Sequence, residues 1–203
     1  MARVASGASM SLDGYIADPS GDVGPLFDWY FSGDVEVPTA GPWVFKTSES
    51  SARLLREMME TCGALVVGRG EFDKTRGWGG RHPMGAPVFV VTHQAPRDWP
   101  FPETPPAEDA PFTFVTDGIE SAIEQAKNVA GEKVVAVNPG SIARQALEAR
   151  LLDEVWIALV PVLLGDGIRY FGDVEKAPVK LETPQVIEAE GVTHLTYRVR
   201  YDT

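Results

Sequence analysis

Short runs of β-branched and other apolar residues recur along the chain, separated by segments whose apolar residues follow helical spacing. The runs predict strands at residues 3–9, 64–68, 87–92, 112–115, 134–137 and 154–162. Spacing of three and four residues predicts helices at 47–61, after 117, and at 141–149. This alternation is typical of an α/β fold with a largely parallel sheet.

The C-terminal pattern changes to a period of two, which predicts an antiparallel hairpin. Residues 185–189 form its first arm, the turn lies at Glu190-Gly191, and residues 194–201 form its second arm. In the second arm apolar and polar residues alternate, so we expect one buried face and one solvent face. With no internal repeat and no linker-like stretch, the pattern predicts one α/β sandwich domain with a mixed sheet over residues 1–203.

Residues 18–46 are rich in glycine and proline, with aromatic residues between them. A structureless loop of this length is uncommon in a compact domain, so we expect the segment to pack on the body. Its aromatic residues, together with Trp78, are expected to shape a substrate pocket or a dimer contact, or simply to belong to the core; those of the segment are Phe27, Trp29, Tyr30, Phe31 and Trp43.

The charge and composition of the chain limit the classes of molecule that it is expected to bind. The formal net charge of −11 argues against a nucleic acid or an anionic membrane as the partner. A small phosphate-bearing molecule stays open, because local arginines and helix ends bind phosphate whatever the global charge. No signal sequence or long apolar run is present, which predicts a cytoplasmic protein.

The histidines and the single cysteine give no sign of a metal or redox site. Cys62 ends a helical apolar stripe, so a core position is favoured over a nucleophile. His82 and His194 have no partner at metal-ligand spacing, and we expect no zinc site.

Ligand-type residues follow three of the predicted strands. In an open α/β sheet, ligands bind outside the carboxyl ends of the strands, so these positions together predict a dinucleotide site. A guanidinium pairs with phosphate, and the first amides of a helix point towards an anion. The positions are Gly68-Arg69, Thr92-His93, and the turn and helix start from Asn138 to Ile142, where Gly140, Ser141 and Ile142 would offer free amides.

Four segments resemble a known family. They are "MSLDGYIA", "ALVVGRGEFD", "PVFVVTH" and "GSIARQALEARLLDEVWIALVPVLLGDGIRYF". They are similar to the C-terminal reductase domain of the bifunctional riboflavin-biosynthesis deaminase-reductase, whose stand-alone relatives share the dihydrofolate reductase fold. The resemblance runs from about Arg3 to Arg200. It implies a three-layer α/β/α sandwich with a mixed, mostly parallel central sheet of about eight strands, NADPH as hydride donor, and a homodimer.

The resemblance also implies roles for individual residues of the cofactor site. Gly68 and Arg69 would contact phosphate, and Thr92 and His93 would meet the adenosine 2′-phosphate. The pyrophosphate turn would consist of Asn138, Pro139, Gly140, Ser141 and Ile142. Ser9 and Ile16 would flank the nicotinamide, and Leu164 and Gly165 would lie near the nicotinamide end of the cleft.

Two carboxylates are candidates for the proton donor. Asp13 reads as a turn residue before Gly14, and the resemblance makes it an active-site or loop-positioning residue. Glu49 is the second candidate, although a carboxylate there also suits the start of a helix. The helix position that carries the pterin-binding carboxylate of dihydrofolate reductase corresponds to Ala52, so dihydrofolate is disfavoured. A pterin- or aminopyrimidine-type substrate is expected, as in the 5-amino-6-(5-phosphoribosylamino)uracil reductase step.

Pro139 departs from the family pattern. The resemblance implies a cis glycine-glycine peptide in the turn, and here the corresponding bond joins Asn138 to Pro139. Because proline lowers the cost of a cis peptide, we expect this bond to be cis and the pyrophosphate site to be retained but weakened. A non-catalytic nucleotide-binding relative, or a protein that binds flavin instead of NADPH, remains an alternative.

Overall fold

The fold is built around one large sheet. The structure is a computed structural model that describes residues 2–201. The strands of the main sheet lie in the order β11-β13-β9-β1-β8-β5-β6-β7, and β12 also pairs with β13. They are β1 (Val4–Ser11), β5 (Cys62–Gly68), β6 (Val88–Val91), β7 (Phe112–Val115), β8 (Val134–Val137), β9 (Glu154–Val160), β11 (Lys180–Leu181), β12 (Gln185–Ala189) and β13 (Val192–Arg200).

The sheet is mixed and mostly parallel, as predicted. All neighbours from β9 to β7 pair in parallel, whereas β13 is antiparallel to β9, β11 and β12. The hairpin of β12 and β13 turns at Glu190-Gly191, which confirms the predicted position. On the polar side of β13, Arg198 and Arg200 are exposed as predicted, whereas Thr196 is half-buried and His194 is only 6% exposed.

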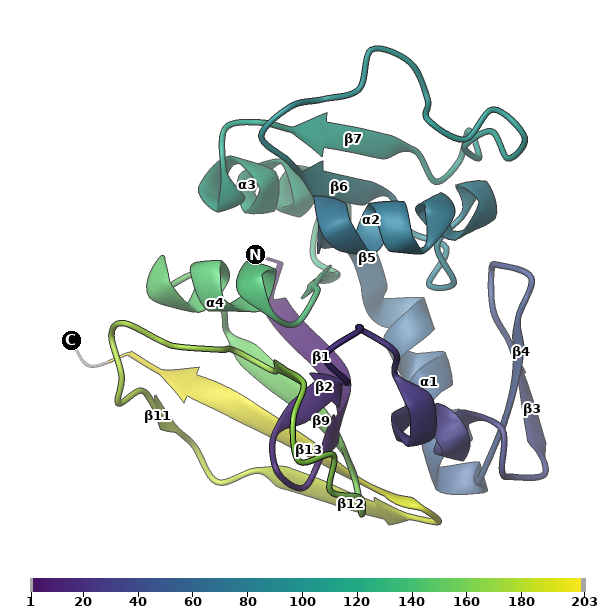
Figure 1. Cartoon of the computed structure of the whole chain (residues 1–203), viewed down its shortest axis with the longest axis vertical. Helices are drawn as coiled ribbons and strands as arrows, with labels where there is room; N and C mark the ends of the chain where they lie inside the picture. Colours follow the sequence, from purple (N-terminus) through teal and green to yellow (C-terminus); the bar gives the residue numbers. More distant parts are fainter. Residues whose placement is uncertain (1, 202–203) are drawn as a thin grey trace.

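Helices cover both faces of the sheet and complete the three layers (Figure 1). They are α1 (Glu49–Thr61), α2 (Arg69–Lys74), α3 (Ile119–Ala130) and α4 (Ser141–Glu148). Helices α3 and α4 pack on one face, where their apolar stripes meet Val66 and Val135 in the largest core cluster. Helices α1 and α2 contribute to two clusters that include Val67 and Val160. Burial of these stripes is the main force that holds the layers together.

The glycine- and proline-rich segment packs on the body through its own short elements. It contains the 3-10 helix η1 (Gly24–Tyr30) and a separate hairpin of β3 (Val35–Pro38) and β4 (Val44–Thr47). Its Leu26, Trp29 and Val37 join the core cluster under α1, which confirms the predicted packing. Phe31 and Trp43 stay exposed, so the segment is only partly core.

Two further short elements complete the chain. Strand β2 (Tyr15–Ala17) pairs with β10 (Ile168–Arg169), which places the two loops that follow β1 and β9 side by side. A second 3-10 element, η2 (Arg76–Gly80), carries Trp78, which is buried in a core cluster and packs on Phe112 and His82. Cys62 is also buried, which confirms the core prediction, and burial raises the pKa of its thiol to about 11.

Candidate active site

A cleft of about 680 Å³ lies at the carboxyl ends of β5, β6 and β8. Because these parallel strands are neighbours in the order β8-β5-β6, residues that follow them reach one edge of the sheet. Of the three predicted groups, the first two line this strand-end cleft in full and the turn after β8 lines it in part. The lining residues from these groups are Gly68, Arg69, Thr92, His93, Ser141 and Ile142. Asn138, Pro139 and Gly140 do not line it.

Arg69 is held in place on the wall of the cleft. Its Nε donates to both carboxylate oxygens of Asp73 at 2.7 and 2.8 Å, and one terminal nitrogen donates to the carbonyl of Gln94 at 3.3 Å. The side chain of Arg69 is 35% exposed, and Arg97 and His93 line the same cleft. Two guanidinium groups and an imidazole give this surface the donors that phosphate oxygens require.

The turn after β8 differs from the prediction. The Asn138-Pro139 bond is trans, and within residues 2–201 the only cis peptide joins Ala177 to Pro178. The turn is closed instead by Gly140, which adopts a φ of 77° that glycine takes without steric cost. A cis peptide is therefore not needed to redirect the chain into α4.

The amide of Gly140 is also unavailable to an anion. It donates to the carbonyl of Tyr170 at 2.7 Å, which corrects the expectation of three free amides in the turn. Ser141 lies exposed at the first position of α4, and Ile142 follows it. Gly68 permits this approach, because a Cβ at Gly68 would lie 3.2 Å from Cγ1 of Ile142.

Asp13 joins the two loops at the carboxyl ends of β1 and β9. It accepts hydrogen bonds from the hydroxyl of Ser11 at 2.6 Å and from the amides of Leu164 and Gly165 at 3.2 and 2.7 Å. The Ser11 hydroxyl and these amides lower the pKa of the Asp13 carboxyl. An ionised, fully engaged carboxylate is a poor proton donor, so the contacts fit the loop-positioning alternative.

Glu49 is not brought to the site. It is exposed in the first turn of α1, where a carboxylate suits the helix dipole, and it lines neither of the cavities described here. Ala52 is fully buried against the cluster of Leu26 and Trp29. The helix position at which dihydrofolate reductase carries its carboxylate is therefore apolar in this chain.

Ser9 and Ile16 have different surroundings. Ser9 is 4% exposed and accepts a hydrogen bond from Nε1 of Trp29 at 3.0 Å. Burial raises the pKa of the adjoining Tyr30 to about 12, although its hydrogen bond with Ser9 acts in the opposite direction. Ile16 is half-buried in β2 and packs against the largest core cluster. Their predicted place beside the nicotinamide stays a prediction.

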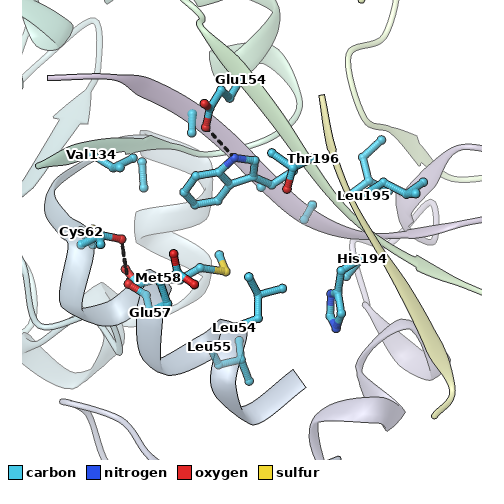
Figure 2. A pocket seen from close by; sticks show the side chains of 18 of the residues that line it. Leu54, Leu55, Glu57, Met58, Cys62, Val134, Glu154, His194, Leu195 and Thr196 are labelled. Atoms are coloured by element: carbon cyan, nitrogen blue, oxygen red, sulfur yellow. Dashed lines mark hydrogen bonds between the residues drawn. The ribbon is translucent and has the colours of Figure 1, made fainter. Parts of the chain in front are cut away.

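A second cavity, of about 650 Å³, lies between α1 and the sheet (Figure 2). Leu54, Leu55 and Met58 of α1 form one wall, and His194 lies on the sheet side. Trp156 of β9 also lines the cavity. Asn138 lines this cavity while Ser141 lines the strand-end cleft, so the turn after β8 stands between the two. We call this space the helix–sheet cavity.

Two polar arrangements in the helix–sheet cavity were not predicted. Nε2 of His194 lies 2.9 Å from the hydroxyl of Ser51, and burial lowers the pKa of His194. Nε1 of Trp156 donates to Glu154 at 3.0 Å, and Glu154 in turn accepts from Arg3 at 2.8 Å. The partners in the first arrangement are 143 residues apart, so no local sequence pattern indicates it.

Comparison with known proteins identifies the family. The sequence model that describes the RibD C-terminal domain matches residues 2–194. The chain belongs to the RibD C-terminal domain family. This confirms the resemblance drawn from the four sequence motifs. No curated protein sequence matches the chain.

Solved structures similar to this RibD C-terminal domain support the same fold. A Shewanella sp. PV-4 protein, described as a candidate riboflavin biosynthesis protein, is 25% identical, with 99% of this chain and 100% of that chain covered and a TM-score of 0.72. A Thermotoga maritima diaminohydroxyphosphoribosylaminopyrimidine deaminase/5-amino-6-(5-phosphoribosylamino)uracil reductase is 18% identical, with a TM-score of 0.59. The match covers 98% of this chain but only 57% of the Thermotoga chain.

The dihydrofolate reductase fold is also confirmed. Dihydrofolate reductase from Enterococcus faecalis, solved with NADP(H), is 16% identical with a TM-score of 0.56, and the match covers 98% of this chain and 97% of that one. Among residues 2–201, no helix is long and apolar enough to cross a membrane. Within the same residues, no three His, Cys, Asp or Glu side chains gather as metal ligands.

Proposed function

We propose that this member of the RibD C-terminal domain family is an NADPH-dependent reductase that transfers hydride to a pterin- or aminopyrimidine-type molecule. The 5-amino-6-(5-phosphoribosylamino)uracil reductase step of riboflavin biosynthesis is the candidate reaction. Family membership and the whole-length similarity to the Shewanella protein support a reductase of the riboflavin pathway. The observation that carries the cofactor assignment is the meeting of Gly68-Arg69, Thr92-His93 and Ser141-Ile142 in one cleft.

The residues present fit NADPH. Arg69 and Arg97 offer guanidinium groups, and α4 offers its N-terminal end at Ser141. The Thr92 hydroxyl lines the same cleft but donates to the carbonyl of Gln94 at 3.0 Å. Bound NADPH would supply the hydride for the reaction. The protein would hold the phosphates at the strand-end cleft, fix the loops after β1 and β9 through Asp13, and exclude water near Ser9 with the buried Trp29.

The proposal is tested by binding and turnover measured separately. Titration calorimetry should detect NADPH binding, and absorbance at 340 nm should fall when the acceptor is a phosphoribosyl aminopyrimidine. NADH and dihydrofolate serve as comparisons, because the apolar Ala52 position disfavours dihydrofolate. No NADPH binding at millimolar concentration would rule out the reductase proposal.

A non-catalytic nucleotide-binding relative is the second candidate. Two observations favour it. The amide of Gly140 already donates to the carbonyl of Tyr170, and the helix position of Ala52 carries no carboxylate. Binding of NADPH without oxidation across pterins, aminopyrimidines and quinones would support this alternative. Yellow colour in the purified protein would instead indicate a bound flavin.

We also propose that the chain forms a homodimer, as the family resemblance implies. The outer edge of the main sheet exposes Leu181 of β11 and Val186 of β12, and apolar edge strands favour association with another chain. Light scattering after size exclusion should give twice the mass of 22.0 kDa. The substitution Val186→Glu should shift the protein towards the monomer.

A further inference from the structure

Two rows of residues that cross three strands lie at the helix–sheet cavity, and all of them except the buried Ser9 line it. Gly7, Trp156 and Thr196 are paired across β1, β9 and β13 and form one row. Ser9, Ala158 and His194 form the next row, two residues further along β1 and β9. Residues two apart on a strand point to the same face, and the rows lie roughly 7 Å apart.

Trp156 is held as a fixed aromatic surface in the first of these rows. Its Nε1 donates to Glu154, which is only 5% exposed and is itself held by Arg3. The adjoining Gly7 has no side chain, and a Cβ there would lie 3.6 Å from Cβ of Trp156. The half-buried indole therefore borders open space in the cavity, which Met58 of α1 also lines.

Polar atoms lie beside this aromatic surface. The contact with Ser51 fixes Nε2 of His194, and the edge of the ring packs on Trp29 at 5.1 Å between centroids. Among the described residues, neither Nδ1 of His194 nor the hydroxyl of Thr196 makes a hydrogen bond. Neither is a fully buried, unpartnered atom, so both have access to the cavity.

Apart from the histidine, the rows carry no ionisable side chain, which suits the uncharged ring of a ligand. Glu154 is already paired with Arg3, and Arg198 lies 3.9 Å from the same carboxylate. The α1 wall opposite the rows presents the apolar Leu54, Leu55 and Met58 together with the carboxylate of Glu57. A cavity of about 650 Å³ is of the size that holds a small molecule.

We propose that Trp156, Thr196 and His194 are the specificity-determining residues that bind the heterocycle of the substrate. The planar ring stacks on the indole of Trp156, and its carbonyl or amino edge bonds to the hydroxyl of Thr196 and to Nδ1 of His194. Ser51 is a positioning residue that orients the imidazole. This inference rests on the proposed function, because it takes the bound molecule to be the hydride acceptor, next to the row that contains Ser9.

The first experiment titrates 5,6-diaminouracil, as a probe of the heterocycle, into the full chain with NADP present. Trp156→Leu should weaken probe binding roughly 5- to 150-fold, the range that corresponds to a base–aromatic stacking contribution of about 1–3 kcal/mol, and Trp156→Phe should retain most of the affinity. Trp43→Leu is the matched control, because Trp43 lies on the β3–β4 hairpin outside the cavity. Affinity for NADPH should stay unchanged in all three variants.

A second set of variants separates recognition from structure. His194→Asn keeps a polar group near the place of Nδ1, whereas His194→Gln keeps one near Nε2 and the contact with Ser51. We expect Asn to retain more probe affinity than Gln, although Gln should leave the melting temperature nearer that of the wild type. Thr196→Val should weaken the probe roughly 2- to 10-fold at unchanged stability.

The outcomes distinguish this inference from the proposed function. If the wild type binds NADPH but not the probe, or if Trp156→Leu binds the probe as well as Trp43→Leu does, the heterocycle assignment is overturned. It is also overturned if Trp156→Leu changes the molecular mass in solution and not the affinity, because the cavity is then a contact with a second copy. If the wild type does not bind NADPH, the proposed function is contradicted instead.

Discussion

The carboxylate of Asp13 accepts a 2.7 Å hydrogen bond from the backbone amide of Gly165, which lies 152 residues later in the chain. The same carboxylate also binds the amide of Leu164. Since Asp13 follows β1 and Gly165 follows β9, this contact fixes two neighbouring loops at the edge where the cofactor is proposed to bind. A single side chain therefore sets the shape of this end of the site.

Asp13→Asn should lower turnover and melting temperature together. The amide retains the shape of the carboxylate but loses its charge, which weakens its bonds to the backbone amides. If Asp13 were the proton donor, the variant would lose activity with no change in melting temperature. Stopped-flow single turnover and differential scanning calorimetry measure the two effects.

The stability that Asp13 contributes should also depend on pH. Its pKa is lowered in the folded state, chiefly by the Ser11 hydroxyl, so the contribution is complete above the ordinary pKa of about 4 and is lost as pH falls through the lowered value. The difference in melting temperature between wild type and Asp13→Asn should therefore shrink in acid. An unchanged difference at low pH would contradict this explanation.

Arg69→Ala should weaken NADPH binding roughly 10- to 100-fold, because hydrogen bonds to charged groups contribute about 1.5–3 kcal/mol. Arg69 lines the cleft and its guanidinium is already oriented by Asp73. Arg53→Ala is the control, since Arg53 is exposed on α1 and lines neither cavity. Calorimetry with NADPH should separate the two variants, and equal affinities would remove Arg69 from the phosphate site.

Burial of Cys62 predicts that its thiol reacts slowly in the native protein and that the stability of the fold falls at alkaline pH. Its pKa is raised to about 11, so its contribution to stability is complete below the ordinary value of about 8.5 and is lost as pH rises towards the folded value. Thiol reagents at pH 8 should react slowly with the native protein and quickly after denaturation. Cys62→Ala should show a smaller alkaline loss, and fast native labelling would contradict the buried assignment.

The strand-end residues could be predicted because each signal is local. Gly68-Arg69 and Thr92-His93 directly follow apolar runs, and parallel pairing of neighbouring strands brings such positions to one edge. The largely parallel sheet and the C-terminal hairpin follow from the same patterns. Residues 18–46 were predicted to be loop-like because glycine and proline hide the short η1, β3 and β4 elements.

The helix–sheet cavity could not be predicted from the sequence. The contact of Ser51 with His194 depends on how β13 pairs with β9 and on where α1 crosses the sheet. The hydrogen bond of the Gly140 amide could not be predicted either, because its partner is the carbonyl of Tyr170, 30 residues later in the chain. A local motif identifies a turn that is able to bind phosphate, but it does not show which amides the rest of the fold already uses.

Pro139→Gly tests what the proline contributes to the turn. The Asn138-Pro139 bond is trans and Pro139 lines neither cavity, so its ring does not block the strand-end cleft. We expect nearly unchanged NADPH affinity but a loss of about 0.4–1 kcal/mol in the free energy of unfolding, because glycine gives the unfolded chain more freedom. Urea denaturation and calorimetry measure both quantities. A clear gain in NADPH affinity would mean that the missing amide of Pro139, and not the fold around Gly140, limits the pyrophosphate site.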